Sequence, residues 1–92
     1  MITGSQIRAA RALLNWTSAE TAKKAQLTRQ TLHRLETYDD VPPSRSGSLV
    51  ALERLFLAQG LEFLEADDFN GEGVRFRERL ALRKRSRDTD RV

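Results

Sequence analysis

The chain lacks cysteine altogether and holds a single histidine, His33, among its 92 residues. The absence of cysteine excludes disulfides and thiolate chemistry, and a lone histidine argues against a zinc site and against Ser-His or Cys-His catalysis. No apolar run approaches the roughly 20 residues that span a bilayer, and residues 1–5 lack the features of a signal peptide. These absences predict a cytoplasmic protein that is not an enzyme, binds no cofactor or metal ion and does not enter a membrane.

The net charge of +3 conceals a separation of charge along the chain. Residues 61–74 contain no basic residue, and their charged side chains are all acidic: Glu62, Glu65, Asp67, Asp68 and Glu72. Residues 75–92 follow with a strong excess of arginine and lysine. This pattern favours a polyanionic partner or pairing between chains, whereas the plainer interpretation is a basic tail that is merely solvated.

Helix-capping residues and apolar spacing predict four helices in one small domain. Thr3 with Gln6, and Thr17 with Glu20, have the spacing of capping boxes, in which each side chain bonds to the other residue's backbone amide. Thr28 is a further candidate for an N-cap. The predicted helices span residues 4–14, 18–25, 29–37 and 47–59.

The third predicted helix has one apolar and one polar face. Leu32 and Leu35 have the spacing of an inward face. The outward side chains are polar or charged: Arg29, Gln30, Thr31, His33 and Arg34. Arginine and glutamine are side chains that read base edges, so this face is predicted to need a partner.

The fourth predicted helix has a wider apolar surface than a domain of this size needs. Val50 and Leu57, seven residues apart, extend its inward stripe sideways. Gly60 is placed to end the helix in a left-handed conformation. We expect a docked hairpin or a second subunit to cover the extra apolar width.

After residue 60 the apolar period changes from that of a helix to that of a strand. The segments LEF and VRF alternate apolar and charged residues, which predicts two strands. Asn70 and Gly71 favour a type I′ turn between them, while Asp67 and Asp68 indicate a loop longer than two residues. The hairpin is expected to close the core or to pair its edge with a second copy, and these two interpretations are compatible.

The predicted fold is therefore mainly α, in three parts. Residues 1–60 form a helical domain, residues 61–80 form a hairpin extension that can serve in dimerisation, and residues 81–92 form a basic tail. From about residue 83 the tail is too polar to fold and is predicted to be disordered.

Residues 3–60 resemble the lambda-repressor-like, or Xre-family, helix-turn-helix domain of bacterial and phage regulators. The resemblance rests on the segments IRAARALLNWT, TSAETA, LTRQTLHRLE and SLVALERLF. The segment LEFLEADDFNGEGVRFR is similar to a short tail found in a subset of small members. The resemblance implies a sequence-specific transcriptional regulator of the repressor type, a homodimer that binds two half-sites in double-stranded DNA and lies at the nucleoid when bound.

The resemblance also assigns roles in the recognition helix. Its base-reading positions fall on Arg29, Gln30 and Arg34, since arginine can pair with guanine and glutamine with adenine. Thr31 and His33 flank this face, where His33 either contacts a phosphate or is simply solvated.

Phosphate contacts are expected at three further places. They fall on Thr28, on Ser18 at the start of the second helix, and on Arg45. Asp39 and Asp40 occupy a loop in which many members present basic groups, which leaves Arg45 as the substitute. A ridge of basic side chains on the second strand is hypothesised to hold the flanking DNA backbone, at about 7 Å spacing: Arg75, Arg77 and Arg79.

Other positions have structural roles in the family pattern. Arg11 and Glu36 match a salt bridge between the first helix and the end of the third. Gln26 and Tyr38 stand where glycine is usual, so Gln26 must either accept a left-handed conformation with strain or remodel the turn. Thr21 replaces a large aliphatic residue, which predicts a thinner core there.

A protein-binding regulator, such as an antitoxin or anti-activator, is the competing interpretation. The apolar excess on the fourth helix would serve that role equally well. A base reader should lose roughly 1–3 kcal/mol of DNA affinity for each contact that alanine removes at Gln30 or Arg34, whereas a protein binder should lose none.

Overall fold

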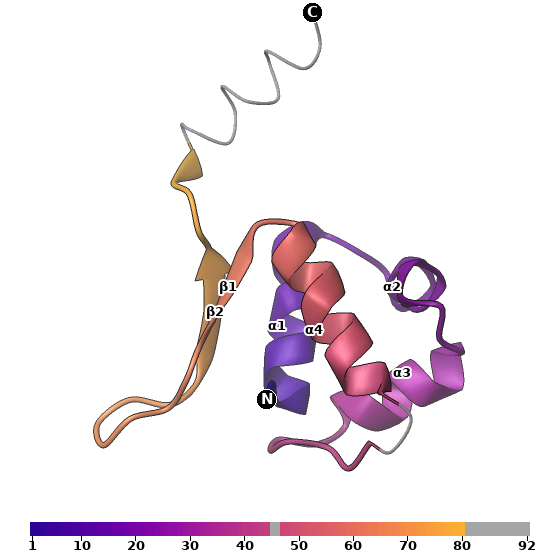
Figure 1. Cartoon of the computed structure of the whole chain (residues 1–92), viewed down its shortest axis with the longest axis horizontal. Coiled ribbons are helices and arrows are strands. Elements are labelled where there is room, and N and C mark those ends of the chain that lie inside the picture. Colours follow the sequence, from indigo (N-terminus) through magenta and orange to yellow (C-terminus); the bar gives the residue numbers. More distant parts are fainter. Residues whose placement is uncertain (45–46, 81–92) are drawn as a thin grey trace, which may run out of the picture.

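The fold was analysed in a computed structural model that describes residues 1–44 and 47–80. Arg45 and the predicted basic tail lie outside the described residues. The described residues form four helices and a two-stranded antiparallel hairpin (Figure 1). In chain order these are α1 (Gly4–Leu14), α2 (Ser18–Ala25), α3 (Arg29–Glu36), α4 (Ser48–Ala58), β1 (Leu61–Leu64) and β2 (Gly73–Phe76). The mainly α fold with a C-terminal hairpin is confirmed, and the predicted helix boundaries agree with the structure within one residue.

Reciprocal capping explains where α1 and α2 begin. The Thr3 hydroxyl accepts from the Gln6 amide (3.1 Å), and the Gln6 side chain accepts from the Thr3 amide (2.9 Å). Thr17 and Glu20 repeat this arrangement at the start of α2, with distances of 3.1 and 3.2 Å. Both predicted capping boxes are therefore present, and each satisfies amides that a helix cannot bond internally.

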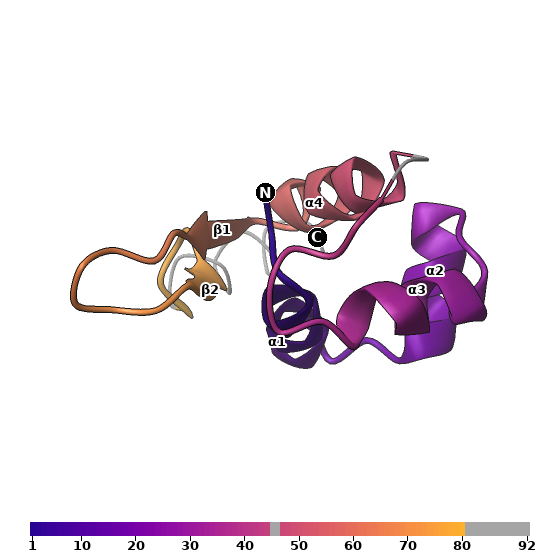
Figure 2. The same ribbon diagram turned by 90° about the horizontal axis from the view of Figure 1, so that it is seen from below.

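One apolar core joins the helices to the hairpin. In the figures, α1 and α4 form the middle of the molecule, with α2 and α3 at one end and the hairpin at the other (Figures 1 and 2). The buried apolar residues are Ile2, Ile7, Ala10, Ala22, Leu32, Leu35, Leu49, Leu52, Phe56 and Leu61. Thr21 is also fully buried, and its hydroxyl donates to the backbone oxygen of Thr17 (2.9 Å). Thr21 is therefore accommodated in the core because its hydroxyl group is hydrogen-bonded.

The hairpin covers one end of this core. Leu61 pairs with Phe76 and Phe63 with Val74 in the antiparallel register. Leu61 is fully buried, and the other three side chains are partly buried against the core. The interpretation that the hairpin closes the core is thus confirmed, and whether its edge pairs with a second copy stays a prediction.

The loop between the strands is longer than a two-residue turn. The predicted type I′ turn is wrong, because neither Asn70 nor Gly71 has a positive φ. Asp67 orders the loop instead: its Oδ1 accepts from the amides of Phe69 (2.8 Å) and Asn70 (2.7 Å), and its own amide donates to the Asn70 oxygen (2.8 Å). A side chain that satisfies local amides competes with the tight turn, which the Asn-Gly pair alone does not reveal.

Gln6 ties the hairpin to α1. Its Nε2 donates to the backbone oxygens of Gly73 (2.8 Å) and Leu64 (3.1 Å). Its Oε1 accepts from the Thr3 amide in the capping box of α1. The residue is only 5% exposed. One buried amide side chain therefore satisfies three backbone groups and fixes the hairpin at the end of the domain remote from α3.

Candidate nucleic-acid interface

A three-residue turn sets α3 against α2. Gln26 ends α2 in a left-handed conformation (φ 58°, ψ 43°), and the Leu27 amide then donates to the Ala22 oxygen (2.8 Å). Thr28 caps α3, since its Oγ1 accepts from the Thr31 amide (3.0 Å). Of the two outcomes expected for Gln26, the left-handed one is observed, and it costs a residue other than glycine roughly 1–2 kcal/mol.

The two faces of α3 differ in the way that the sequence predicts. Leu32 and Leu35 are fully buried in the core. Thr31 is half-buried, and its hydroxyl accepts from that of Thr28 (2.9 Å). The exposed side chains of the predicted reading face are Arg29, Gln30, His33 and Arg34. Four of the five predicted side chains of this face are thus open to a partner, and the fifth supports the cap.

Arg34 has a contact within the chain. Its Nη1 donates to the backbone oxygen of Pro43 (3.0 Å), in the segment that leads from α3 toward α4. The Arg34 side chain is nevertheless exposed. A guanidinium has five N–H donors, so this bond steers Arg34 toward the connecting segment and leaves other donors for a ligand.

The start of α2 offers backbone amides that have no partner in the described residues. The capping box uses the Glu20 amide, and no hydrogen bond within the described residues occupies the amides of Ser18 and Ala19. Amides at a helix N-terminus attract anions, because the helix dipole adds to their partial positive charge. Ser18 is half-buried at the place where the sequence predicts a phosphate contact.

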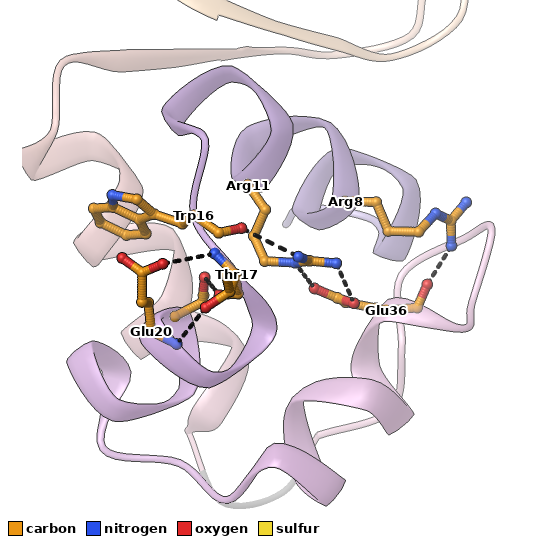
Figure 3. A network of polar contacts seen from close by, with 7 residues as sticks. Arg8, Arg11, Trp16, Thr17, Glu20 and Glu36 are labelled. Atoms are coloured by element: carbon orange, nitrogen blue, oxygen red, sulfur yellow. Dashed lines mark hydrogen bonds and ion pairs between the residues drawn. The ribbon is translucent and has the colours of Figure 1, made fainter.

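An ion pair fixes the end of α3 to α1 (Figure 3). Arg11 Nε lies 2.5 Å from Glu36 Oε1, and Arg11 Nη2 lies 3.1 Å from Glu36 Oε2. The Glu36 side chain is 8% exposed and that of Arg11 is 22% exposed. Arg11 Nη1 also donates to the Trp16 oxygen (3.2 Å), so the guanidinium holds three segments together. The predicted structural pair is therefore present, and it ties the end of α3 to α1.

Sequence reasoning missed the part that Arg8 plays beside this pair. Its Nη1 donates to the backbone oxygen of Glu36, and its Nη2 pairs with Asp39 Oδ1 (3.2 Å), as Figure 3 shows for the Glu36 bond. Arg8 precedes Arg11 by about one helical turn, and this spacing was the available signal. Asp39 thus stabilises the contact between α1 and the segment that follows α3.

The proposed ridge of three arginines on one strand face is wrong. Only Arg75 lies within β2, and its Nη2 pairs with Glu62 on β1 (2.9 Å). Arg77 lies beyond the strand, where its Nη2 donates to the Leu57 oxygen near the end of α4 (3.4 Å). Arg79 is exposed outside the strand. Strand β2 is too short to carry all three arginines on one face. Glu62 on the neighbouring strand also pairs with Arg75 and offsets its charge.

Residues 1–44 and 47–80 contain neither a group of metal-holding side chains nor a helix that could span a membrane. No group of three His, Asp or Glu side chains in residues 1–44 and 47–80 is arranged to hold a metal ion. None of the helices in this part of the chain has the length and apolar content that crossing a bilayer requires.

Comparisons with protein-family models and with curated proteins found no match to this chain. The resemblance to the Xre family therefore rests on the residues and geometry described above.

Proposed function

We propose that the protein is a sequence-specific DNA-binding transcriptional regulator, with α2, the turn at residues 26–28 and α3 as a lambda-repressor-like helix-turn-helix. One observation carries the proposal: Arg29, Gln30 and His33 are exposed on a helix whose opposite face is buried in the core. Arginine can donate two bonds to guanine and glutamine can pair with adenine, at roughly 1–3 kcal/mol of discrimination for each good pair. The reading face is rigid because Thr28, Arg11 and Glu36 hold both ends of α3.

Phosphate contacts would set the register of α3 in the groove. The amides of Ser18 and Ala19 and the hydroxyl of Thr28 lie at the starts of the two helices, where DNA phosphates are favoured. Arg34 then supports the segment toward α4 and offers its remaining donors to a base or a phosphate. Such contacts position the protein, while the exposed side chains of α3 read the sequence.

The mechanism that fits a small regulator of this kind is steric. Two copies related by a twofold axis place their α3 helices in successive major grooves, roughly 34 Å apart, and so occupy a promoter. Repression then needs no catalytic step, cofactor or metal ion. The protein acts in the cytoplasm, at the nucleoid when bound.

The test begins with selection of binding duplexes from a random DNA pool by the full chain. Fluorescence anisotropy then compares the selected duplex with a scrambled one at two salt concentrations, because nonspecific binding is steeply salt-dependent. A preference of about a thousandfold or more establishes sequence reading. Equal binding to both duplexes under all conditions would refute the proposal.

A matched pair of variants locates the reading face. Gln30→Ala should weaken binding to the selected duplex by roughly 5- to 160-fold and leave binding to the scrambled duplex unchanged. Gln59→Ala removes the same side chain from an exposed position at the end of α4 and should change neither affinity. Equal effects of the two variants would exclude α3 as the reading helix.

Phe69 favours a second candidate function, that of a protein-binding regulator. Its side chain is 93% exposed on the loop that Asp67 orders, among acidic residues. Ordered exposed aromatic residues are frequent anchors in protein interfaces. This reading predicts that Phe69→Ala abolishes a protein complex while Gln30→Ala does not, and co-purification of tagged variants tests it.

A further inference from the structure

The outer face of α4 carries a line of apolar side chains that the described elements leave partly exposed. Val50 is 40% exposed and Leu57 is 39% exposed. They are seven residues apart, so they lie on one line along the helix. Figure 2 shows α4 along the upper edge of the molecule, with the other described helices below it. Of the two expected covers, the hairpin packs against α4 through Phe63 and Phe56 and leaves Val50 and Leu57 partly exposed.

Two opposite charges flank this line. With 3.6 residues per turn, Glu53 falls about 50° to one side of the line and Arg54 about 50° to the other. Adjacent residues on a helix do not face each other, so these two cannot pair within α4. Within residues 1–44 and 47–80 neither side chain takes part in an ion pair. We call the set of Val50, Glu53, Arg54 and Leu57 the α4 ridge.

We propose that a second copy of this chain docks on the α4 ridge, with the two α4 helices side by side and pointing in the same direction. In such a pair the twofold axis runs parallel to the helices, so the Glu53 flank of one copy faces the Arg54 flank of the other. Val50 and Leu57 each meet their own counterparts in the middle. The ridge is thus self-complementary: an apolar centre is bordered by two equivalent Glu53–Arg54 pairs.

The opposite orientation is disfavoured by the same charges. If the two helices ran antiparallel, the twofold axis would lie across them and would bring like flanks together. Glu53 would then face Glu53 of the second copy, and Arg54 would face Arg54. Like charges at the border of an interface disfavour an arrangement, so the charge pattern selects the parallel pair.

This inference names the contact on which the proposed two-half-site binding rests. It is tested without DNA, so a failure of dimerisation is distinguishable from a failure of sequence reading. The measurement is sedimentation velocity of the full chain over a range of concentrations up to about 100 µM, which covers dissociation constants of a weak homodimer. Circular dichroism verifies that each variant is folded.

Val50→Glu tests the apolar centre of the ridge. We expect it to raise the dissociation constant of the dimer by about a hundredfold or more, since two carboxylates are then placed in an apolar contact. Ala51→Glu makes the same change in charge at an exposed position of α4 outside the ridge and should leave the dimer intact. A dimer that resists Val50→Glu, or a chain that stays monomeric throughout, would overturn the proposal and favour a different occupant of the ridge.

Charge reversal tests the direction of the helices. Glu53→Arg turns both attractive pairs into repulsive ones in the parallel arrangement and should weaken the dimer by about tenfold. Adding Arg54→Glu exchanges the two charges and should restore the dimer to wild-type strength. In an antiparallel pair the single change leaves the like-charge contacts as they were, so an unchanged dimer with Glu53→Arg would refute the proposed orientation.

Discussion

Gly4 lies so close to the backbone of Tyr38 that a Cβ on Gly4 would stand 1.9 Å from the Tyr38 oxygen and 2.7 Å from that of Leu35. The Gly4 amide also donates to the Asp40 oxygen (3.2 Å). The first turn of α1 is thus pressed against the chain that leaves α3. Because the obstructing atoms are backbone, they cannot swing aside as a flexible side chain would.

Gly4→Ala should therefore destabilise the fold, by about 3 kcal/mol, through overpacking. Denaturant unfolding measures the change in free energy. Gly71→Ala is the matched control, since no atom lies within 4 Å of its Cβ position, and it should shift stability by less than about 0.5 kcal/mol. A stabilised Gly4→Ala variant would mean that helix propensity outweighs the contact, contrary to the structure.

Glu36→Gln should cost about 2 kcal/mol of unfolding free energy, because it leaves the Arg11 guanidinium without its counter-charge. The value lies below that of a fully buried pair since Arg11 is 22% exposed. Asp39→Asn breaks the Arg8 pair, in which the Asp39 side chain is 93% exposed, and should cost less than about 0.5 kcal/mol. Equal costs in denaturant titrations would show that burial does not distinguish the two pairs.

Gln26→Gly should stabilise the protein by about 0.5–1 kcal/mol, since glycine takes the left-handed conformation without the steric cost of a Cβ. The melting temperature, followed by circular dichroism, should rise by roughly 4 °C for a domain of this size. Asn15 has the same left-handed backbone (φ 60°), but asparagine tolerates it, so Asn15→Gly should give a smaller gain. A destabilised Gln26→Gly variant would show that the side chain has a role that outweighs the strain.

The loop at Asp67 should respond to acid. The amides of Phe69 and, to a lesser extent, Asn70 donate to its carboxylate and lower the pKa of Asp67 below its usual value of 3.8. A lowered pKa in the folded state means that the stabilisation is fully present above about pH 4 and is lost as the pH falls through the lowered pKa. The amide NMR shifts of Phe69 and Asn70 should therefore titrate together below pH 4. Asp67→Asn should abolish this titration, and its persistence in the variant would assign it to another group.

The helices were predictable because their signals are local. Each capping box joins residues three apart, and the apolar spacing of Leu32 and Leu35 depends only on helical geometry. The polar row on α3 follows from the same period. The candidate site was therefore largely readable from the sequence, apart from Arg45, which lies outside the described residues.

The contacts that Arg34 and Arg75 make within the chain could not be predicted from periodicity. The bond from Arg34 to Pro43 depends on the path of the chain after α3. The pairing of Arg75 with Glu62 depends on a strand register that the long loop sets. Alternation shows which residues share a strand face, but it does not give the length of the strand or the charge opposite.

The sequence by itself determined the four helices, their caps and the composition of the exposed face of α3, because these depend on residues within one or two helical turns. Tertiary structure decided how the parts meet: Gln6 bonds to Gly73, Arg8 bonds to the Glu36 backbone, and Gly4 packs against Tyr38. These contacts join residues that are far apart in the chain. Only packing of the shared core brings them within bonding distance, and no local pattern encodes that approach.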